Sequence, residues 1–284
     1  MKKIFFSFFS KIAQFLPLPI KQGLYRFSPL ARMLRGALNA SVEDGLATVE
    51  VSGGDLRGWK VLINLKTEKS RWLGTYEPEL QAAIRDLIAP GATVYDVGAN
   101  IGYVSLLLAK RVGPAGRVFA FEPLPANLER IRQNVALNQL NNVTVVPAAV
   151  TDQNGEVTFY VHDSVGMGKA AGSAGRSNSV YRAEIRVAAL SLDEFIFGQG
   201  NPPPQVVKMD IEGGEVLALP GMKRALETHH PLMLLELHGP ESEQAAWQAL
   251  SGAGYRLSAM RPAYPPIHSA TELGWKAYLI ARHD

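Results

Sequence analysis

The fold can be inferred from the stretch Thr93-Val-Tyr-Asp-Val-Gly-Ala-Asn-Ile-Gly102. Its first half is rich in β-forming residues and follows the turn signal Pro90-Gly91, which predicts a buried strand. Its second half contains two glycines, and the apolar run from Tyr103 to Lys110 that follows them predicts a helix. A strand, a glycine turn and a helix in this order are typical of the ligand-binding corner of a doubly wound α/β sheet.

The spacing of the glycines narrows the class of ligand. A dinucleotide fingerprint has the form Gly-x-Gly-x-x-Gly, and the place of its second glycine is taken by Asn100. An NAD-dependent oxidoreductase is therefore disfavoured and stays the alternative. The pattern Asp-x-Gly-x-x-x-Gly, which begins at Asp96, resembles instead the first motif of class I S-adenosylmethionine (SAM) methyltransferases. Alone, this motif leaves SAM, another nucleotide and no ligand open.

The composition limits the classes of function. The chain has 284 residues, enough for one α/β domain with an extension, and no cysteine, which excludes disulfides, thiolate metal sites and a cysteine nucleophile. Seven of its 29 basic residues lie in residues 1–42, which hold no acid, and the rest of the chain has 22 basic and 26 acidic residues. This distribution argues against a nucleic-acid surface that covers the domain.

The N-terminal residues form a basic, amphipathic extension. Apolar residues recur there at helical spacing and predict one apolar stripe: Phe5, Phe8, Phe9, Ile12, Phe15 and Leu16. The stripe either packs on the domain or a dimer partner, or residues 1–20 make a peripheral contact with an anionic membrane. Lys11 interrupts the apolar run, and no run reaches the ~18 apolar residues of a membrane span. We therefore expect a cytoplasmic protein, with peripheral membrane association as the alternative and the oligomeric state open.

Two places before and after the glycine turn carry candidate ligand-binding acids. Tyr76 and Glu77 stand just before a predicted helix and should lie near the turn, although an acid there is also favoured by the helix dipole. Glu122 ends the strand predicted from Arg117, 24 residues after Gly98. An acid at this position accepts both ribose hydroxyls of a nucleoside, whereas the alternative is a turn residue. We favour the ligand role because its spacing agrees with the glycine motif.

Two later strands carry titratable residues at their C-terminal ends. Residues 206–209 predict a buried strand followed by Asp210, and residues 232–238 predict another, with Glu236 and His238 on one face. Ligand chemistry in open α/β sheets takes place at this edge. Asp210 or His238 is a candidate general base for a proton of the acceptor. Alternatively, Asp210 and Glu236 hold a divalent cation that acidifies the hydroxyl of the acceptor. The sequence does not choose between these schemes.

The chain as a whole resembles the FkbM family of SAM-dependent methyltransferases. The matching residues are Gly74-Thr-Tyr-Glu77, Asp96-Val-Gly-Ala-Asn-Ile-Gly102, Phe121-Glu-Pro123, Leu192-Asp193, Lys208-Met-Asp-Ile-Glu-Gly-Gly-Glu215 and Glu236-Leu-His-Gly239. The resemblance implies a Rossmann-like class I fold with a seven-stranded, mostly parallel sheet and a C-terminal antiparallel hairpin. It also implies methyl transfer to a hydroxyl of a sugar, glycolipid or polyketide-like small molecule.

We divide the chain into three parts on this basis. Residues 1–45 are the extension, residues 46–90 a strand pair and a helix that lead into the core, and residues 91–284 the SAM-binding methyltransferase domain. The glycine-rich residues 162–182 predict a long loop inside that domain, either a mobile lid over the site or a disordered insertion.

The expected site has two groups of residues. The cofactor SAM is expected to contact Asp96, Gly98, Ala99, Asn100, Gly102, Glu122, Tyr76 and Glu77. In this scheme Glu122 holds the ribose, and the glycine turn admits the methionine part. The catalytic group is Asp210, Glu236 and His238. A non-catalytic nucleoside-binding or membrane-associated scaffold is a further alternative.

Overall fold

The computed structural model describes residues 45–162, 167–174, 181–274 and 276–283. The amphipathic stripe expected in residues 5–16 and the membrane contact expected in residues 1–20 lie outside the described residues. Within the described ranges, every helix is too short or too polar to cross a membrane.

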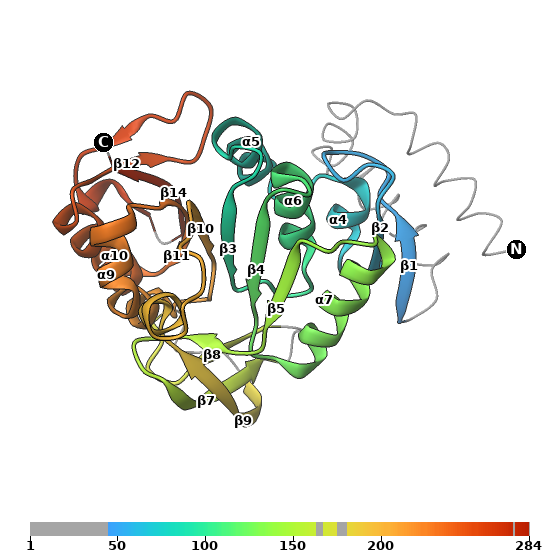
Figure 1. Cartoon of the computed structure of the whole chain (residues 1–284), viewed down its shortest axis with the longest axis horizontal. Coiled ribbons are helices and arrows are strands. Elements are labelled where there is room, and N and C mark those ends of the chain that lie inside the picture. Colours follow the sequence, from blue (N-terminus) through green and yellow to red (C-terminus); the bar gives the residue numbers. More distant parts are fainter. Residues whose placement is uncertain (1–44, 163–166, 175–180, 275, 284) are drawn as a thin grey trace, which may run out of the picture.

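The described residues build an α/β structure around one central sheet (Figure 1). Its eight strands run in the order β13-β12-β14-β11-β10-β3-β4-β5. Their bounds are β3 Thr93–Val97, β4 Arg117–Phe121, β5 Val143–Val146, β10 Val206–Met209, β11 Leu232–His238, β12 Tyr255–Ala259, β13 Pro266–Ile267 and β14 Lys276–His283. Strands β5, β4, β3, β10 and β11 pair in parallel, and β14 and β12 pair antiparallel.

The prediction of a mostly parallel α/β sheet is confirmed. The predicted count of seven strands is one short for the described part of the chain, because the connection between β12 and β14 adds the two-residue strand β13 at the sheet edge. So short a strand has too few residues to show a period in the sequence.

Helices cover both faces of the central sheet. They are α5 Pro78–Leu87, α6 Tyr103–Val112, α7 Pro125–Leu137, α8 Glu215–Ala218, α9 Lys223–His229 and α10 Pro240–Gly252, with short turns η1 Glu194–Gly198, η2 Pro220–Met222 and η3 Ala270–Glu272. Because successive strand residues point to opposite faces, Val94 joins the core with Ile84 of α5 and Leu106 of α6. Its neighbour Tyr95 joins the second core with Leu226 of α9.

An N-terminal hairpin docks on helix α7. Strands β1 (Leu46–Glu50) and β2 (Lys60–Asn64) pair antiparallel and lead into α4 (Lys69–Leu73). Asn134 of α7 accepts a hydrogen bond from the Leu62 amide at 2.6 Å, and Asn138 accepts one from the Lys60 amide at 3.0 Å. These contacts carry the segment after α4, with Tyr76 and Glu77, to the glycine turn.

A second, four-stranded sheet follows the parallel strand β5. Its order is β6-β9-β7-β8, with bounds β6 Ala149–Val150, β7 Gly155–His162, β8 Gly168–Ala170 and β9 Tyr181–Leu190. Figure 1 shows β7, β8 and β9 at the lower end of the molecule. Part of the predicted glycine-rich loop is therefore an ordered strand. At Gly168 a Cβ atom would lie 2.5 Å from both the Phe159 ring and the Tyr160 carbonyl, so only glycine permits this pairing.

Gly98 is the point where the glycine turn passes closest to β10. Its φ is +80°, and a Cβ atom there would lie 1.9 Å from the Asp210 carbonyl oxygen. Gly113 has a similar φ of +69° but open space around a Cβ atom. We expect Gly98→Ala to lower the free energy of unfolding by about 1–3 kcal/mol more than Gly113→Ala, because only the first adds steric overlap to backbone strain. Urea denaturation of both variants measures the difference, and equal losses would disprove the close approach.

Candidate active site

A cavity of about 820 Å³ opens at the C-terminal ends of the parallel strands. This is the edge where ligands bind in open α/β sheets, and the volume lies in the range of small-molecule sites. Eight of the predicted site residues line it: Tyr76, Glu77, Gly98, Ala99, Asn100, Glu122, Asp210 and Glu236. The lining does not include Asp96, Gly102 or His238, although each lies next to a lining residue in the sequence or in space.

Asp96 is fully buried beneath the cavity and is linked to it through Lys208. Its carboxylate accepts a hydrogen bond from the Ser105 hydroxyl at 2.6 Å and lies 3.2 Å from the Lys208 ammonium. Lys208 also donates to the Gly98 carbonyl at 3.1 Å and lines the cavity. Burial alone would lower the pKa of Lys208. The charges of Asp96 and the other nearby carboxylates outweigh this effect and raise the pKa, so the lysine stays charged.

Lys208 was not assigned a functional role from the sequence. The available signal was a lysine inside an apolar strand, where a charge is rare unless it is paired. The partner became visible only with the parallel register, in which Lys208 stands opposite Asp96.

Glu122 closes the glycine turn and also faces the cavity. One carboxylate oxygen accepts a hydrogen bond from the Asn100 amide at 2.9 Å, and the other accepts one from the Leu124 amide at 2.9 Å. The Asn127 side chain also donates to this carboxylate, so three of its roughly four lone-pair sites are in use. Burial raises the pKa of Glu122 to about 7, although these hydrogen bonds oppose the shift. The residue therefore combines a structural contact with free acceptor capacity.

Tyr76 and Glu77 form the wall of the cavity beside the glycine turn. The Tyr76 ring meets the edge of the Tyr103 ring at a centroid distance of 5.7 Å, and the Arg71 guanidinium lies 4.2 Å above the Tyr76 ring. Burial raises the pKa of Glu77, and the charge on Lys208 opposes this shift. The predicted position of both residues near the turn agrees with the geometry.

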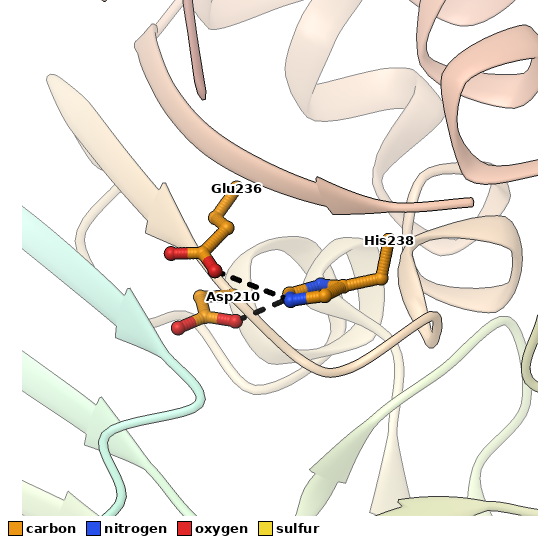
Figure 2. Close-up of side chains that lie close together, drawn as sticks. All are labelled: Asp210, Glu236 and His238. Atoms are coloured by element: carbon orange, nitrogen blue, oxygen red, sulfur yellow. Dashed lines mark ion pairs between the residues drawn. The ribbon is translucent and has the colours of Figure 1, made fainter. Parts of the chain in front are cut away.

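The side chains of Asp210, Glu236 and His238 converge (Figure 2), and the first two line the cavity. Asp210 follows β10, and the other two residues lie on β11, so the parallel pairing of these strands brings them together. One imidazole nitrogen of His238 is 3.2 Å from Glu236, and the other is 3.9 Å from Asp210. One ligand-type atom from each residue lies within 4.8 Å of the other two.

More acids surround His238 than the three residues predicted from the sequence. Glu212 lies 3.6 Å and Glu215 lies 3.8 Å from its ring nitrogens. Burial lowers the pKa of His238, but the nearby carboxylates, above all Glu215 and Glu236, outweigh it and raise the pKa to about 10. The imidazole is then protonated at neutral pH and has no lone pair to accept a proton. This arrangement argues against His238 as the general base.

The two carboxylates beside His238 differ in their environments. Burial raises the pKa of Asp210, and the charge on Lys208 opposes this without cancelling it. Burial also raises the pKa of Glu236, but hydrogen bonds from His238 and Lys276 outweigh it and hold the pKa below its ordinary value. Asp210 is thus the carboxylate whose proton affinity moves toward neutral pH, as a general base requires.

A family model and two relatives identify the family of this chain. The model of the Methyltransferase FkbM domain matches residues 96–257, more than half of the chain. The hexuronic acid methyltransferase AglP of Haloferax volcanii is 28% identical over 162 residues, which cover 56% of this chain and 62% of AglP. The 31-O-demethyl-FK506 methyltransferase FkbM of Streptomyces tacrolimicus is 27% identical over 212 residues, which cover 66% of this chain and 80% of that protein.

Among solved structures, the methyltransferase FkbM from Methylobacillus flagellatus KT is similar to this chain with a TM-score of 0.43 and 20% identity. The alignment covers 76% of this chain and 54% of that one. The chain therefore spans less than two thirds of the length of AglP and about half of this structure.

Proposed function

The chain belongs to the FkbM methyltransferase family, and we propose that it transfers a methyl group from SAM to a hydroxyl oxygen. As acceptor we propose a sugar, a glycolipid or a polyketide-like small molecule. The observation that carries the proposal is one cavity that is lined by the glycine turn, Glu122 and Asp210. The names of AglP and of FkbM, which refer to a hexuronic acid and to 31-O-demethyl-FK506, support this class of acceptor.

The residues around the cavity fit SAM. The carboxylate of Glu122 lines the cavity as an acceptor for ribose hydroxyls, and Gly98, Ala99 and Asn100 line the cavity beside it. Glu77 offers a carboxylate for a positively charged group. When bound, SAM supplies a methyl group that is already electrophilic. The protein's own task is then to align the acceptor oxygen, exclude water and remove a proton.

Asp210 is the general base in this proposal. It lines the cavity, and burial shifts its pKa upward, which improves its match to the proton that it removes. Protonated His238 pairs with Glu236, and Glu236 also pairs with Lys276. These ion pairs fix the side chains that surround Asp210. We therefore give Glu236 and His238 positioning roles beside Asp210.

A divalent cation is the second scheme for the same three side chains. Among the described residues, the buried Asp210 Oδ1 and His238 Nδ1 atoms have no hydrogen-bond partner, and both are atoms that ligate metals. Two features oppose the scheme: His238 would have to lose its proton, and Lys276 already pairs with Glu236. If present, the cation would lower the pKa of the acceptor hydroxyl.

Calorimetric titration with SAM, S-adenosylhomocysteine (SAH) and NAD tests the proposed function. We expect micromolar binding of SAM and SAH, no binding of NAD, and transfer of labelled methyl groups from SAM to members of a library of sugars and hydroxylated small molecules. Binding of NAD instead would favour the oxidoreductase. Binding of SAH without transfer to any hydroxyl would favour the non-catalytic scaffold.

A further inference from the structure

Arg71 of α4 is a largely buried cation whose ion pair with Glu68 is long. Only 14% of its side chain is exposed, and it lines the cavity. Its ion-pair partner among the described residues is Glu68, at 3.9 Å. Glu68 is already held by Arg130, whose two terminal nitrogens bind its oxygens at 2.6 and 3.2 Å. One carboxylate therefore serves two guanidinium groups, and Arg71 is the more distant one.

Two buried donors in this corner of the cavity lack an acceptor. The Nε atom of Arg71 and the hydroxyl of Tyr103 have no hydrogen-bond partner in the part of the chain that the structure describes. Both residues pack on Tyr76, Arg71 over its ring and Tyr103 in a T-shaped ring contact, and all three line the cavity. A buried donor without a partner is costly, most of all on a charged group. The corner therefore matches a ligand that brings an anionic acceptor.

This corner of the cavity lies beside the glycine turn, where SAM is proposed to bind. Tyr103 is the first residue of α6 and follows Gly102 directly, so the donors lie beside the glycine turn. Glu122 lies on the other side of that turn, at the end of the neighbouring strand β4. A ligand whose ribose contacts Glu122 and which runs along the turn ends in the corner of Arg71.

The same corner also contains a carboxylate. Glu77 follows Tyr76, lines the cavity and adopts the left-handed φ of +43° that directs the chain into α5. A guanidinium and a carboxylate next to each other are complementary to the carboxylate and the ammonium of an α-amino acid. SAM carries such a group at the end opposite to its adenine.

We propose that Arg71, assisted by the Tyr103 hydroxyl, binds the α-carboxylate of the methionine part of SAM, and that Glu77 binds its α-ammonium. The inference rests on the proposed function, because it takes SAM as the ligand. The shared chemistry is a carboxylate, which an acidic acceptor sugar could also supply, and the test separates these two sources.

Two nucleosides that differ only in the amino-acid part test the assignment. SAH contains it, whereas 5′-methylthioadenosine retains the sulfur, ribose and adenine without it. We expect Arg71→Gln to weaken SAH binding about 10- to 100-fold, the loss of a charge-assisted hydrogen-bonded pair, and to leave 5′-methylthioadenosine binding unchanged. Arg71→Lys should retain part of the affinity for SAH. The matched control is Arg132→Gln, on the exposed side of α7, which should change neither affinity.

Each other outcome has a separate meaning. An equal loss for both nucleosides in Arg71→Gln would show a structural role and overturn the assignment. Unchanged SAH binding would also overturn it, and glucuronate binding at saturating SAH, lost in the same variant, would then place the carboxylate on the acceptor. If the unaltered protein binds neither nucleoside, the proposed function fails, and the inference fails with it.

Discussion

Asp210→Asn is expected to lower the turnover number of methyl transfer by about 10²- to 10⁴-fold, the range that a positioned general base contributes. The amide has nearly the shape of the carboxylate but cannot accept the acceptor's proton. Asp210 lies in the wall of the cavity with an upward-shifted pKa, while the neighbouring His238 is already protonated. Of the three predicted catalytic residues, Glu236 lines the cavity but has a lowered pKa, and His238 does not line the cavity.

The measurement is the rate of methyl transfer from labelled SAM, together with the dissociation constant of SAH. We expect SAH binding to change less than about threefold, because the substitution removes a charge from the catalytic wall and not a contact proposed for the cofactor. The exposed Asp152 provides the matched control, and Asp152→Asn should have the activity of the unaltered protein. Unchanged turnover in Asp210→Asn would remove this residue from every scheme considered for the site.

Chelation separates the two roles proposed for Asp210. If the carboxylate acts as the base alone, treatment of the unaltered protein with EDTA leaves turnover unchanged. If it holds a divalent cation, EDTA abolishes turnover and added Mg²⁺ or Mn²⁺ restores it, but neither ion restores Asp210→Asn. The arrangement of Lys276 on Glu236 leads us to expect the first result.

Glu122→Ala is expected to weaken SAH binding by about 10²- to 10³-fold. The hydrogen bonds from the ribose hydroxyls to this carboxylate account for about 3–4 kcal/mol, the lower part of the range for two bonds of about 1.5–3 kcal/mol each. The amides of Asn100 and Leu124 also lose their acceptor in this variant, which loosens the turn. Glu122→Gln retains one acceptor oxygen near its original position and should therefore lose less affinity.

The pH dependence of SAH affinity shows whether binding requires the negative charge of Glu122 or only the shape of its side chain. The pKa of this residue is raised to about 7, so its carboxylate gains a proton as the pH falls through neutrality. If only the ionised form binds the ribose, the affinity for SAH decreases about tenfold from pH 8 to pH 6. The dependence should vanish in Glu122→Gln and persist in Glu129→Gln, a substitution on the exposed face of α7. A flat profile in the unaltered protein would contradict the ribose role.

The positions of the main elements could be predicted from local sequence. The strand, turn and helix around the glycine motif follow from a period and from turn residues within about twenty positions, and the structure has them as β3 and α6. Glu122, Asp210 and Glu236 could be placed near one another because the carboxyl ends of parallel strands meet at one edge. In the glycine-rich stretch the local reasoning was wrong for β8, because pairing with β7 overrides the weak strand preference of Gly168 and its neighbours.

The sequence by itself determined the fold class, the edge of the sheet that carries the site and the residue types gathered there, since periodicity and strand ends are local properties. Tertiary structure alone decided the charge of those residues. His238 keeps its proton because acids from β11 and from the turn before α8 surround it, and Lys208 keeps its charge through the register with Asp96. Arg71 of α4 and Tyr103 of α6 come together through their contacts with Tyr76. Such effects depend on distances between segments far apart in the chain, and a pattern within one segment does not contain them.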